Sequence, residues 1–306
     1  MRIEAGNDMT SYLTVNTSQS TKSKLRYACQ GFYGSLIKTY RQKDEWGKCA
    51  NCGKLTRFNY HPMLDVNSSI AVSCGWDEKF TEEINLVNTL NCFHCHAKFR
   101  VRCVAESLLK LGWKGQFSSI SDLVSHLRTT SSEWLVLETA STGGIFSNYE
   151  QIENVMKSEY FDDVDNGDTI NGIYSEDLQS LTLNNQTLDA LISLDVFEHI
   201  ADPWKAFSEV ERVLKPKGIG LITVPIDTRN HNTQTLVKLE NNELQYLREP
   251  SYHIDPLRQE GTLVFTEFGT DIVSQLRSRG HKASFDTYRT KRTGVTQFVI
   301  IIEKSD

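Results

Sequence analysis

An acid and a histidine, Glu198 and His199, directly follow an apolar run, Ala190–Leu194, that ends at Asp195. An apolar run of this length is typical of a buried strand in a parallel sheet, which delivers polar groups to a cleft at its carboxyl end. Because imidazole exchanges protons near neutral pH, the segment predicts a site for acid–base chemistry, with His199 as the first candidate base.

A second candidate base is His253, and Asp255 stands two residues later as the side chain that would orient it. A histidine at either position can instead cap a helix or pack in the core. Both interpretations stay open for His199 and for His253.

Two C-x-x-C pairs, Cys49/Cys52 and Cys92/Cys95, form a second group with chemical potential. Four thiolates at this spacing predict a tetrahedral, structural zinc site. The interval between the pairs is longer than in compact zinc motifs, so the second pair must return across an insertion. Buried free thiols are the other interpretation. Nearby residues that we rank lower as ligands are Cys74, His94 and His96.

Composition narrows the class of protein. All 7 cysteines lie in the first third of the 306 residues, and an odd, clustered set suits a reduced compartment, so we expect a cytoplasmic protein. The polar segment 1–23 lacks the apolar core of a secretory signal, and no apolar run has the length of a membrane span. A formal net charge of −6 provides no broad field for nucleic acid, so nucleic-acid binding is not expected.

The elements that position these residues follow from the apolar pattern. Asp202-Pro203 predicts a helix start, and the helical spacing of apolar residues runs to a stop at Pro216 and Gly218. Strand, helix and strand in succession form a βαβ unit, so residues 133–306 are expected to be α/β with a mostly parallel, doubly wound sheet. The expected strands are 134–138, 155–159, 170–174, 189–194, 219–224, 283–288 and 295–302, with a helix over 268–280.

The remaining residues divide into three predicted parts. Residues 1–45 are read as a polar tail with a helical arm, 46–104 as a zinc-ribbon-like cysteine module and 105–132 as a helical linker. After the second cysteine pair, Lys98, Arg100 and Arg102 would share one face of a strand. There they would bind a phosphate or sugar-nucleotide group, or simply face solvent.

The motifs after residue 190 resemble those of the class I S-adenosylmethionine-dependent methyltransferases. The resemblance lies in Asp195–His199 ("DVFEH"), in Arg212–Gly218 ("RVLKPKG") and in a strand that ends at Val224-Pro225. It implies a seven-stranded Rossmann-like sheet with an antiparallel last strand, and S-adenosylmethionine as cofactor. Segments such as Ser158–Asp162 and Tyr252–Leu257 resemble a bacterial, polysaccharide-associated subgroup, over about residues 133–303.

The same resemblance implies the cofactor-binding residues. The first strand would end in Glu138 and lead to Gly143 and Gly144, Glu159 would accept hydrogen bonds from the ribose hydroxyls, and Asp177 with the Leu178 backbone would meet the adenine. Asp195 would contact the cofactor's amino group or the acceptor. The chain departs from the pattern at Ala140 and Thr142, where the family has glycines. At about 1 to 2 kcal/mol for a side chain held at positive φ, such a change weakens binding about tenfold without abolishing it.

The resemblance thus implies a methyltransferase that acts on a hydroxyl of a sugar, a glycan or another small acceptor, with the cysteine module helping to select it. One alternative is an RNA methyltransferase that holds nucleic acid through the arginines of the module. Another is a non-catalytic scaffold in which Ala140 and Thr142 mark a lost cofactor site and the module binds a protein partner.

Overall fold

The structure is a computed structural model, and it describes residues 43–60, 76–139, 142–241, 243–253 and 261–304. Residues Lys43–Asp306 form one compact unit. The predicted tail, most of the helical arm, Cys74, Ala140 and Asp255 lie outside the described residues. Among the helices described, none is long and apolar enough to cross a membrane.

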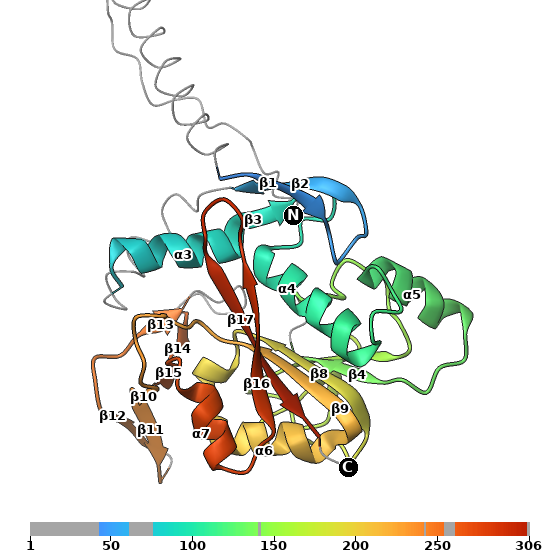
Figure 1. Cartoon of the computed structure of the whole chain (residues 1–306). Coiled ribbons are helices and arrows are strands. Elements are labelled where there is room, and N and C mark those ends of the chain that lie inside the picture. Colours follow the sequence, from blue (N-terminus) through green and yellow to red (C-terminus); the bar gives the residue numbers. More distant parts are fainter. Residues whose placement is uncertain (1–42, 61–75, 140–141, 242, 254–260, 305–306) are drawn as a thin grey trace, which may run out of the picture. The chain divides into compact units, whose positions relative to one another are not determined.

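A central sheet carries the predicted parallel strands (Figure 1). Its strand order is β16-β17-β9-β8-β4-β5-β7-β6, in which β17 is antiparallel to β9, as expected for the last strand. The parallel strands are β4 (Val136–Glu138), β5 (Val155–Glu159), β7 (Ile173–Ser175), β8 (Leu188–Leu194) and β9 (Leu214–Thr223), and the closing hairpin is β16 (Ala283–Arg289) with β17 (Thr296–Glu303).

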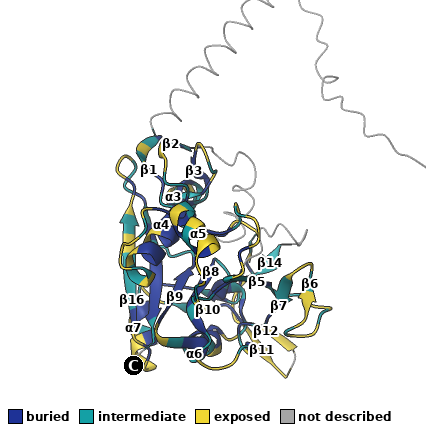
Figure 2. Cartoon of the chain, turned by 90° about the vertical axis from the view of Figure 1, so that its right-hand side faces the viewer, coloured by how far each residue is buried: buried dark blue, intermediate teal, exposed yellow. Residues whose placement is uncertain are grey.

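Helices cover both faces of this sheet. Successive residues of a strand point to opposite faces, and in β9 the side chain of Ile219 lies toward Gly112 while Gly220 lies under Val210 of helix α6 (Pro203–Val213). Helix α6 begins as predicted, because the Asp202 side chain accepts hydrogen bonds from the first-turn amides. Figure 2 shows the buried central strands enclosed between the helices. Helix α7 (Ile272–Ser278) contributes side chains to the same core as α6.

The prediction of seven strands was wrong by one edge strand. Residues 170–174 form a hairpin of β6 (Thr169–Ile170) with β7 rather than a single strand. Asn171 and Gly172 have φ angles of 53° and 81°, the conformation that a tight hairpin turn requires. The Asn-Gly pair was the sequence signal for this turn.

Two boundaries also differ from the prediction. Residues 214–218, expected to end a helix, already belong to strand β9, and the helix expected over 268–280 is limited to α7. The polar stretch between β9 and α7 holds short strand pairs instead of a plain loop. They are β10 (Gln234–Thr235) with β15 (Thr266–Glu267), β11 (Val237–Glu240) with β12 (Glu243–Tyr246), and β13 (Tyr252–His253) with β14 (Thr262–Leu263).

The cysteine-bearing part combines a small antiparallel sheet with helices. The strands are β1 (Glu45–Lys48), β2 (Leu55–Tyr60) and β3 (Leu90–Cys92), and the helices are α3 (Glu78–Thr89), α4 (Phe99–Ser107), the π-helix η1 (Leu108–Gly112) and α5 (Ile120–Thr129). Arg100 and Arg102 therefore lie in a helix, and the strand expected there was wrong. Glu45, assigned to the helical arm, lies in β1.

Candidate functional site

The four cysteines of the two C-x-x-C pairs meet at one point. The ligand atoms of Cys49, Cys52, Cys92 and Cys95 all lie within 4.8 Å of one another. The sulfurs of Cys49 and Cys95 are 3.7 Å apart, and those of Cys52 and Cys92 are 3.8 Å apart. Four sulfurs placed tetrahedrally at about 2.3 Å from one ion would be about 3.8 Å apart. The spacing of the thiols fits a tetrahedral zinc ion.

Two tight turns shape this cluster. In the first pair, the Gly53 amide donates to the Cys49 carbonyl at 2.8 Å, and Gly53 has a φ of 76°. In the second, the His96 amide donates to the Cys92 carbonyl at 2.9 Å, with His96 at a φ of 57°. His94 and His96 are exposed and lie outside the cluster of potential ligands. The place of His96 in this turn explains why a histidine stands beside the second cysteine pair without being one of the potential ligands.

The cysteine cluster is fastened to the loop that follows β4. The Asn51 side chain donates to the Ile145 carbonyl at 2.7 Å, and the Tyr149 hydroxyl donates to the Asn51 carbonyl at 2.9 Å. The Asn148 side chain donates to the Cys95 carbonyl at 2.7 Å. Residues 142–154 form bends and turns with no helix among them, so the cysteine cluster supports a stretch that has no regular structure of its own.

Glu138 organises the start of the same loop. Its side chain is 1% exposed and accepts a hydrogen bond from the Ile145 amide at 2.6 Å. A Cβ added at Gly144 would lie 2.3 Å from this carboxylate, so glycine is required there. Gly143 has a φ of 76° and open space beside it. Burial raises the pKa of Glu138 to about 7, although the Ile145 and Phe146 amides act in the opposite direction.

Asp195, at the carboxyl end of β8, forms an ion pair with Arg100 of helix α4. The Thr223 hydroxyl also donates to the Asp195 carboxylate at 2.8 Å, and Asp195 itself has a φ of 53°. Burial lowers the pKa of Arg100 to about 10, a value at which the guanidinium is still charged near neutral pH. The cysteine-bearing part therefore places a cation beside the strand end where we predicted a cofactor or acceptor contact.

Three residues beyond Asp195, Glu198 lies between the two predicted bases. Its Oε1 is 3.7 Å from His199 Nε2 and 3.7 Å from His253 Nδ1, and the two imidazole centroids are 5.0 Å apart. Glu198 is 2% exposed. Burial raises its pKa, but the two histidines lower it more, so the net pKa lies below the ordinary value.

Tertiary structure rather than sequence proximity brings His253 to this place. His253 lies in β13, which pairs with β14, and the Leu263 carbonyl of β14 accepts a hydrogen bond from His199 Nδ1 at 2.8 Å. The Phe265 amide donates to the Glu198 carbonyl at 2.8 Å. We assigned Glu198 no role from sequence; its position between Asp195 and His199 was the only available signal.

The remaining predicted cofactor residues lie at the ends of neighbouring strands. Glu159 ends β5 and is half-buried, and its carbonyl accepts the Glu176 amide at 2.9 Å. Asp177 follows β7, where its carboxylate accepts the Gln179 amide at 2.8 Å. Leu178 is 6% exposed and belongs to the core. The carboxyl ends of β4, β5, β7 and β8 thus present Glu138, Glu159, Asp177 and Asp195 along one edge of the sheet.

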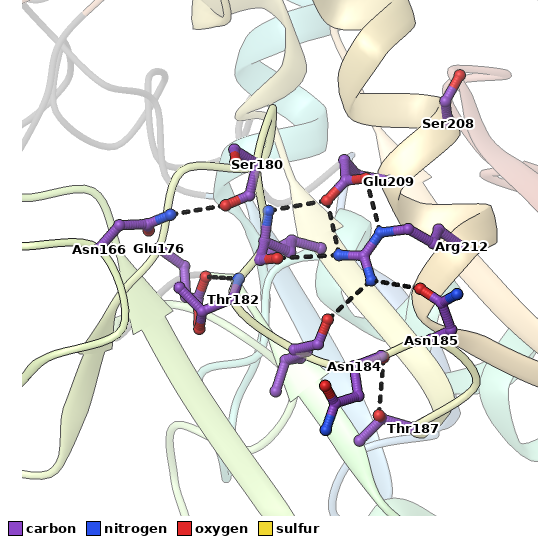
Figure 3. A network of polar contacts seen from close by, with 12 residues as sticks. Asn166, Glu176, Ser180, Thr182, Asn184, Asn185, Thr187, Ser208, Glu209 and Arg212 are labelled. Atoms are coloured by element: carbon purple, nitrogen blue, oxygen red, sulfur yellow. Dashed lines mark hydrogen bonds and ion pairs between the residues drawn. The ribbon is translucent and has the colours of Figure 1, made fainter.

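A polar network holds the loop after β7 (Figure 3). Arg212 of α6 donates to the Leu181 carbonyl at 2.9 Å and to the Leu183 carbonyl at 2.8 Å, and pairs with Glu209 at 2.7 Å. The second carboxylate oxygen of Glu209 accepts the Leu181 amide at 2.9 Å. The predicted adenine contacts therefore stand on a loop that is fastened at several points to helix α6.

A cavity of about 390 Å³ opens beside Asp195. It lies between α3, the segment after β9 and the β16–β17 hairpin. Its lining mixes apolar and polar side chains, and the polar ones include Lys79, Glu83, Asn88 and Arg289. The volume lies in the range of small-molecule sites, whereas the lining is more polar than in most of them.

Comparison with known proteins gives a family match and similar solved structures. Residues 147–222 match the family model described as "Methyltransferase domain". No curated protein sequence matches the chain. Among solved structures, an S-adenosylmethionine-dependent methyltransferase from Methanosarcina mazei is 17% identical, with 59% of this chain and 97% of that chain covered and a TM-score of 0.33.

Two further solved structures are similar. The 1,6-didemethyltoxoflavin-N1-methyltransferase of Burkholderia thailandensis is 12% identical, with 82% of this chain and 96% of that chain covered and a TM-score of 0.38. A chain from the complex of the Haloferax volcanii Trm112 methyltransferase activator with a methyltransferase is 12% identical, with 64% and 96% covered and a TM-score of 0.36.

The matched segment 147–222 contains β5, β7, β8, α6 and all but the last residue of β9, so it includes most of the parallel strands, with β4 before it. Over this segment the chain has a methyltransferase domain on a Rossmann-like α/β sheet, which indicates an S-adenosylmethionine-dependent methyltransferase.

The residues at the sheet edge fit the cofactor. The positive φ and open surroundings of Gly143 leave room for a ligand beside the backbone, and Glu159 stands at the strand end where a ribose is expected. When bound, S-adenosylmethionine supplies an electrophilic methyl group on a sulfonium.

Proposed function

We propose that the chain transfers the methyl group of S-adenosylmethionine to a hydroxyl of a sugar-type or other small acceptor. The observation that carries this proposal is the buried Glu198 held between His199 and His253, four residues past the end of β8. A hydroxyl must lose its proton as it attacks a methyl group, so a site for hydroxyl acceptors needs groups that assist this loss. Glu198, His199 and His253, here called the Glu-His-His centre, are the groups that would do so.

The proposed roles at the cofactor edge follow from where each side chain lies. Glu138 holds the loop that carries Gly143 and Gly144, and Glu159 would bind the ribose hydroxyls, because a carboxylate accepts two donors at once. The loop of Asp177 and Leu178 would meet the adenine. Asp195, which already balances Arg100, would help to orient the amino group or the acceptor.

The acceptor would enter the cavity beside Asp195. Displacement at a methyl group requires the attacking oxygen to lie in line with the leaving sulfur, so positioning dominates the catalysis. Lys79, Glu83 and Asn88 line the cavity with donors and acceptors, a set that suits a hydroxyl-rich molecule. A sugar-type acceptor, first expected from the polysaccharide-associated resemblance, is consistent with this lining.

The alternative of an RNA methyltransferase has less support. Arg102, one of the cations that were to hold the nucleic acid, is 7% exposed and stacks on the Phe58 ring at 3.4 Å. Arg100 is bound to Asp195. The engagement of these two arginines inside the fold and the net charge of −6 both disfavour a nucleic-acid site.

We also propose that the cysteine cluster holds a structural zinc ion. The support is the fit of both sulfur–sulfur distances to a tetrahedral site and the absence of a disulfide at these cysteines. The free thiols agree with the expected cytoplasmic location. The zinc-loaded cluster would stabilise the loop after β4 through Asn51 and Asn148; a protein partner of this part of the chain stays a prediction.

The test of the cofactor site is isothermal calorimetry with S-adenosylmethionine. We expect micromolar binding to the wild type, and at least tenfold weaker binding to Glu159→Ala, which loses a charge-assisted contact. Glu153→Ala removes an exposed acid that precedes the amino end of β5, away from the cofactor edge, and should bind like the wild type. Equal binding by the two variants would contradict the assignment of Glu159, and no binding to the wild type would contradict the proposed function.

The test of the zinc site is metal analysis of the purified chain. We expect zinc to be retained at the cluster and lost from Cys92→Ser, with a lower melting temperature for that variant. Cys103→Ser alters a buried cysteine outside the cluster and should keep its zinc. Wild-type protein without zinc at the cluster, and with an unchanged melting temperature after treatment with a chelator, would contradict a structural ion.

A further inference from the structure

We propose that the Glu-His-His centre binds a divalent transition-metal ion, separate from the ion at the cysteine cluster. The proposal deepens the function above and rests on it, because the ion would act on the acceptor hydroxyl. Four observations carry it: the state of the Glu198 carboxylate, the distances between the donor atoms, the orientation of the rings, and the chemistry of the donor set.

Glu198 is an anion in need of a partner. It is 2% exposed, and neither of its carboxylate oxygens has a hydrogen bond within the described part of the chain. A carboxylate buried without hydrogen bonds is costly and rare in a folded protein. The Arg100 guanidinium attracts this carboxylate but does not hydrogen-bond to it, because Arg100 is paired with Asp195. A cation between Glu198 and the two imidazoles would balance the charge of this carboxylate.

The donor atoms are spaced for a common ion. Glu198 Oε1 lies 3.7 Å from His199 Nε2 and 3.7 Å from His253 Nδ1, distances that are too long for hydrogen bonds. Donor atoms bound to one ion at about 2.1 Å are separated by about 3.0 to 3.4 Å. The three atoms lie within 4.8 Å of one another, so small side-chain adjustments would bring them to bonding distance.

The rings are held in the orientation that metal binding requires. His199 Nδ1 lies 2.8 Å from the Leu263 carbonyl, which can only accept, so Nδ1 carries the proton and Nε2 presents its lone pair toward Glu198. In metal sites, a backbone carbonyl often fixes the tautomer of a ligating histidine in this way. His253 is held by the pairing of β13 with β14, and the Trp76 ring packs 5.7 Å from it.

The donor set indicates the kind of ion. Two imidazoles and one carboxylate favour divalent ions such as Zn²⁺, Fe²⁺ or Mn²⁺, whereas the four thiols of the cysteine cluster favour Zn²⁺. Three protein ligands leave coordination positions open. An acceptor oxygen at such a position would lose its proton more easily, because the charge of the ion lowers the pKa of the hydroxyl.

The test is an electron paramagnetic resonance titration with Mn²⁺, made on protein that retains one zinc per chain after dialysis. Mn²⁺ is the probe because it competes poorly for the thiols of the cysteine cluster. We expect one Mn²⁺ per wild-type chain and at least tenfold weaker binding to Glu198→Gln, which keeps the shape and loses the charge. His253→Gln should be weakened similarly. His231→Ala, an exposed histidine elsewhere, should bind like the wild type.

Folding and cofactor binding are recorded in the same samples. We expect at least one of the variants Glu198→Gln and His253→Gln to retain the wild-type melting temperature and S-adenosylmethionine affinity. The Mn²⁺ affinity of that variant is then compared with the wild type. Mn²⁺ binding by that variant equal to the wild type, or no Mn²⁺ binding by the wild type, would overturn the metal site. Cofactor binding without Mn²⁺ binding refutes this inference alone, whereas loss of cofactor binding in the wild type refutes the proposed function.

Discussion

Replacement of Glu138 by glutamine should change how the stability of the protein depends on pH. The ordinary pKa of a glutamate is 4.5, and burial raises that of Glu138 to about 7. The folded state therefore holds this proton to a higher pH than the unfolded state does. Stability from this group is greatest below about pH 4.5, falls between pH 4.5 and 7, and is constant above that.

The magnitude follows from the same two values. At 1.36 kcal/mol per pH unit, the difference between 4.5 and about 7 corresponds to about 3 kcal/mol of unfolding free energy. Glu138→Gln keeps an oxygen for the Ile145 amide and cannot ionise. Its unfolding free energy, relative to the wild type, should therefore rise by about 3 kcal/mol from pH 4.5 to pH 8.

Urea denaturation at a series of pH values measures this difference. The exposed Glu133→Gln serves as the matched control and should follow the wild type at every pH. A constant difference between Glu138→Gln and the wild type across the range would refute the reasoning. It would mean that the amides of the loop fully compensate the burial of the carboxylate.

Three further outcomes are expected. Gly144→Ala, whose Cβ would lie 2.3 Å from the Glu138 carboxylate, should lose about 1 to 3 kcal/mol of stability and weaken cofactor binding in calorimetry. Gly143→Ala should lose about 1 to 2 kcal/mol of stability. Unchanged stability of Gly144→Ala would contradict the contact. Asp195→Asn leaves Arg100, 13% exposed, without its counter-ion and should cost about 3 to 5 kcal/mol in urea denaturation, with recovery when Arg100→Met is added. Arg212→Ala should cost about 1 to 3 kcal/mol and weaken cofactor binding, and Arg212→Lys should recover little of either; full recovery with lysine would argue against the forked contacts.

Local chemistry explains which parts of the fold were predictable from sequence. Asp202-Pro203 marks a helix start because the cap and the fixed φ act within one turn, and the strand before Asp195 is apolar because both of its faces are buried. The spacing within each C-x-x-C pair is enough to predict that its two sulfurs can bind one ion. Each of these signals needs only residues that are close in the chain.

The unpredicted features depend on residues that are distant in the chain. Arg100 reaches Asp195 only because α4 packs on β9 and β17, and Glu198 meets His253 only through the pairing of β13 with β14. The segment after β4 is likewise hydrogen-bonded to the cysteine cluster, a contact that no local pattern reveals. The extra strand β6 differs from these features, because the Asn-Gly pair at its hairpin turn is a local sequence signal from which the hairpin could have been predicted.

The ion pair between Arg100 and Asp195 has a consequence for how such a chain can be divided or recombined. Its two partners come from the cysteine-bearing part and from the methyltransferase sheet, and each would be left as an isolated charge if the other part were exchanged. The methyltransferase sheet therefore cannot be combined with a different N-terminal part without also replacing one of these two charges.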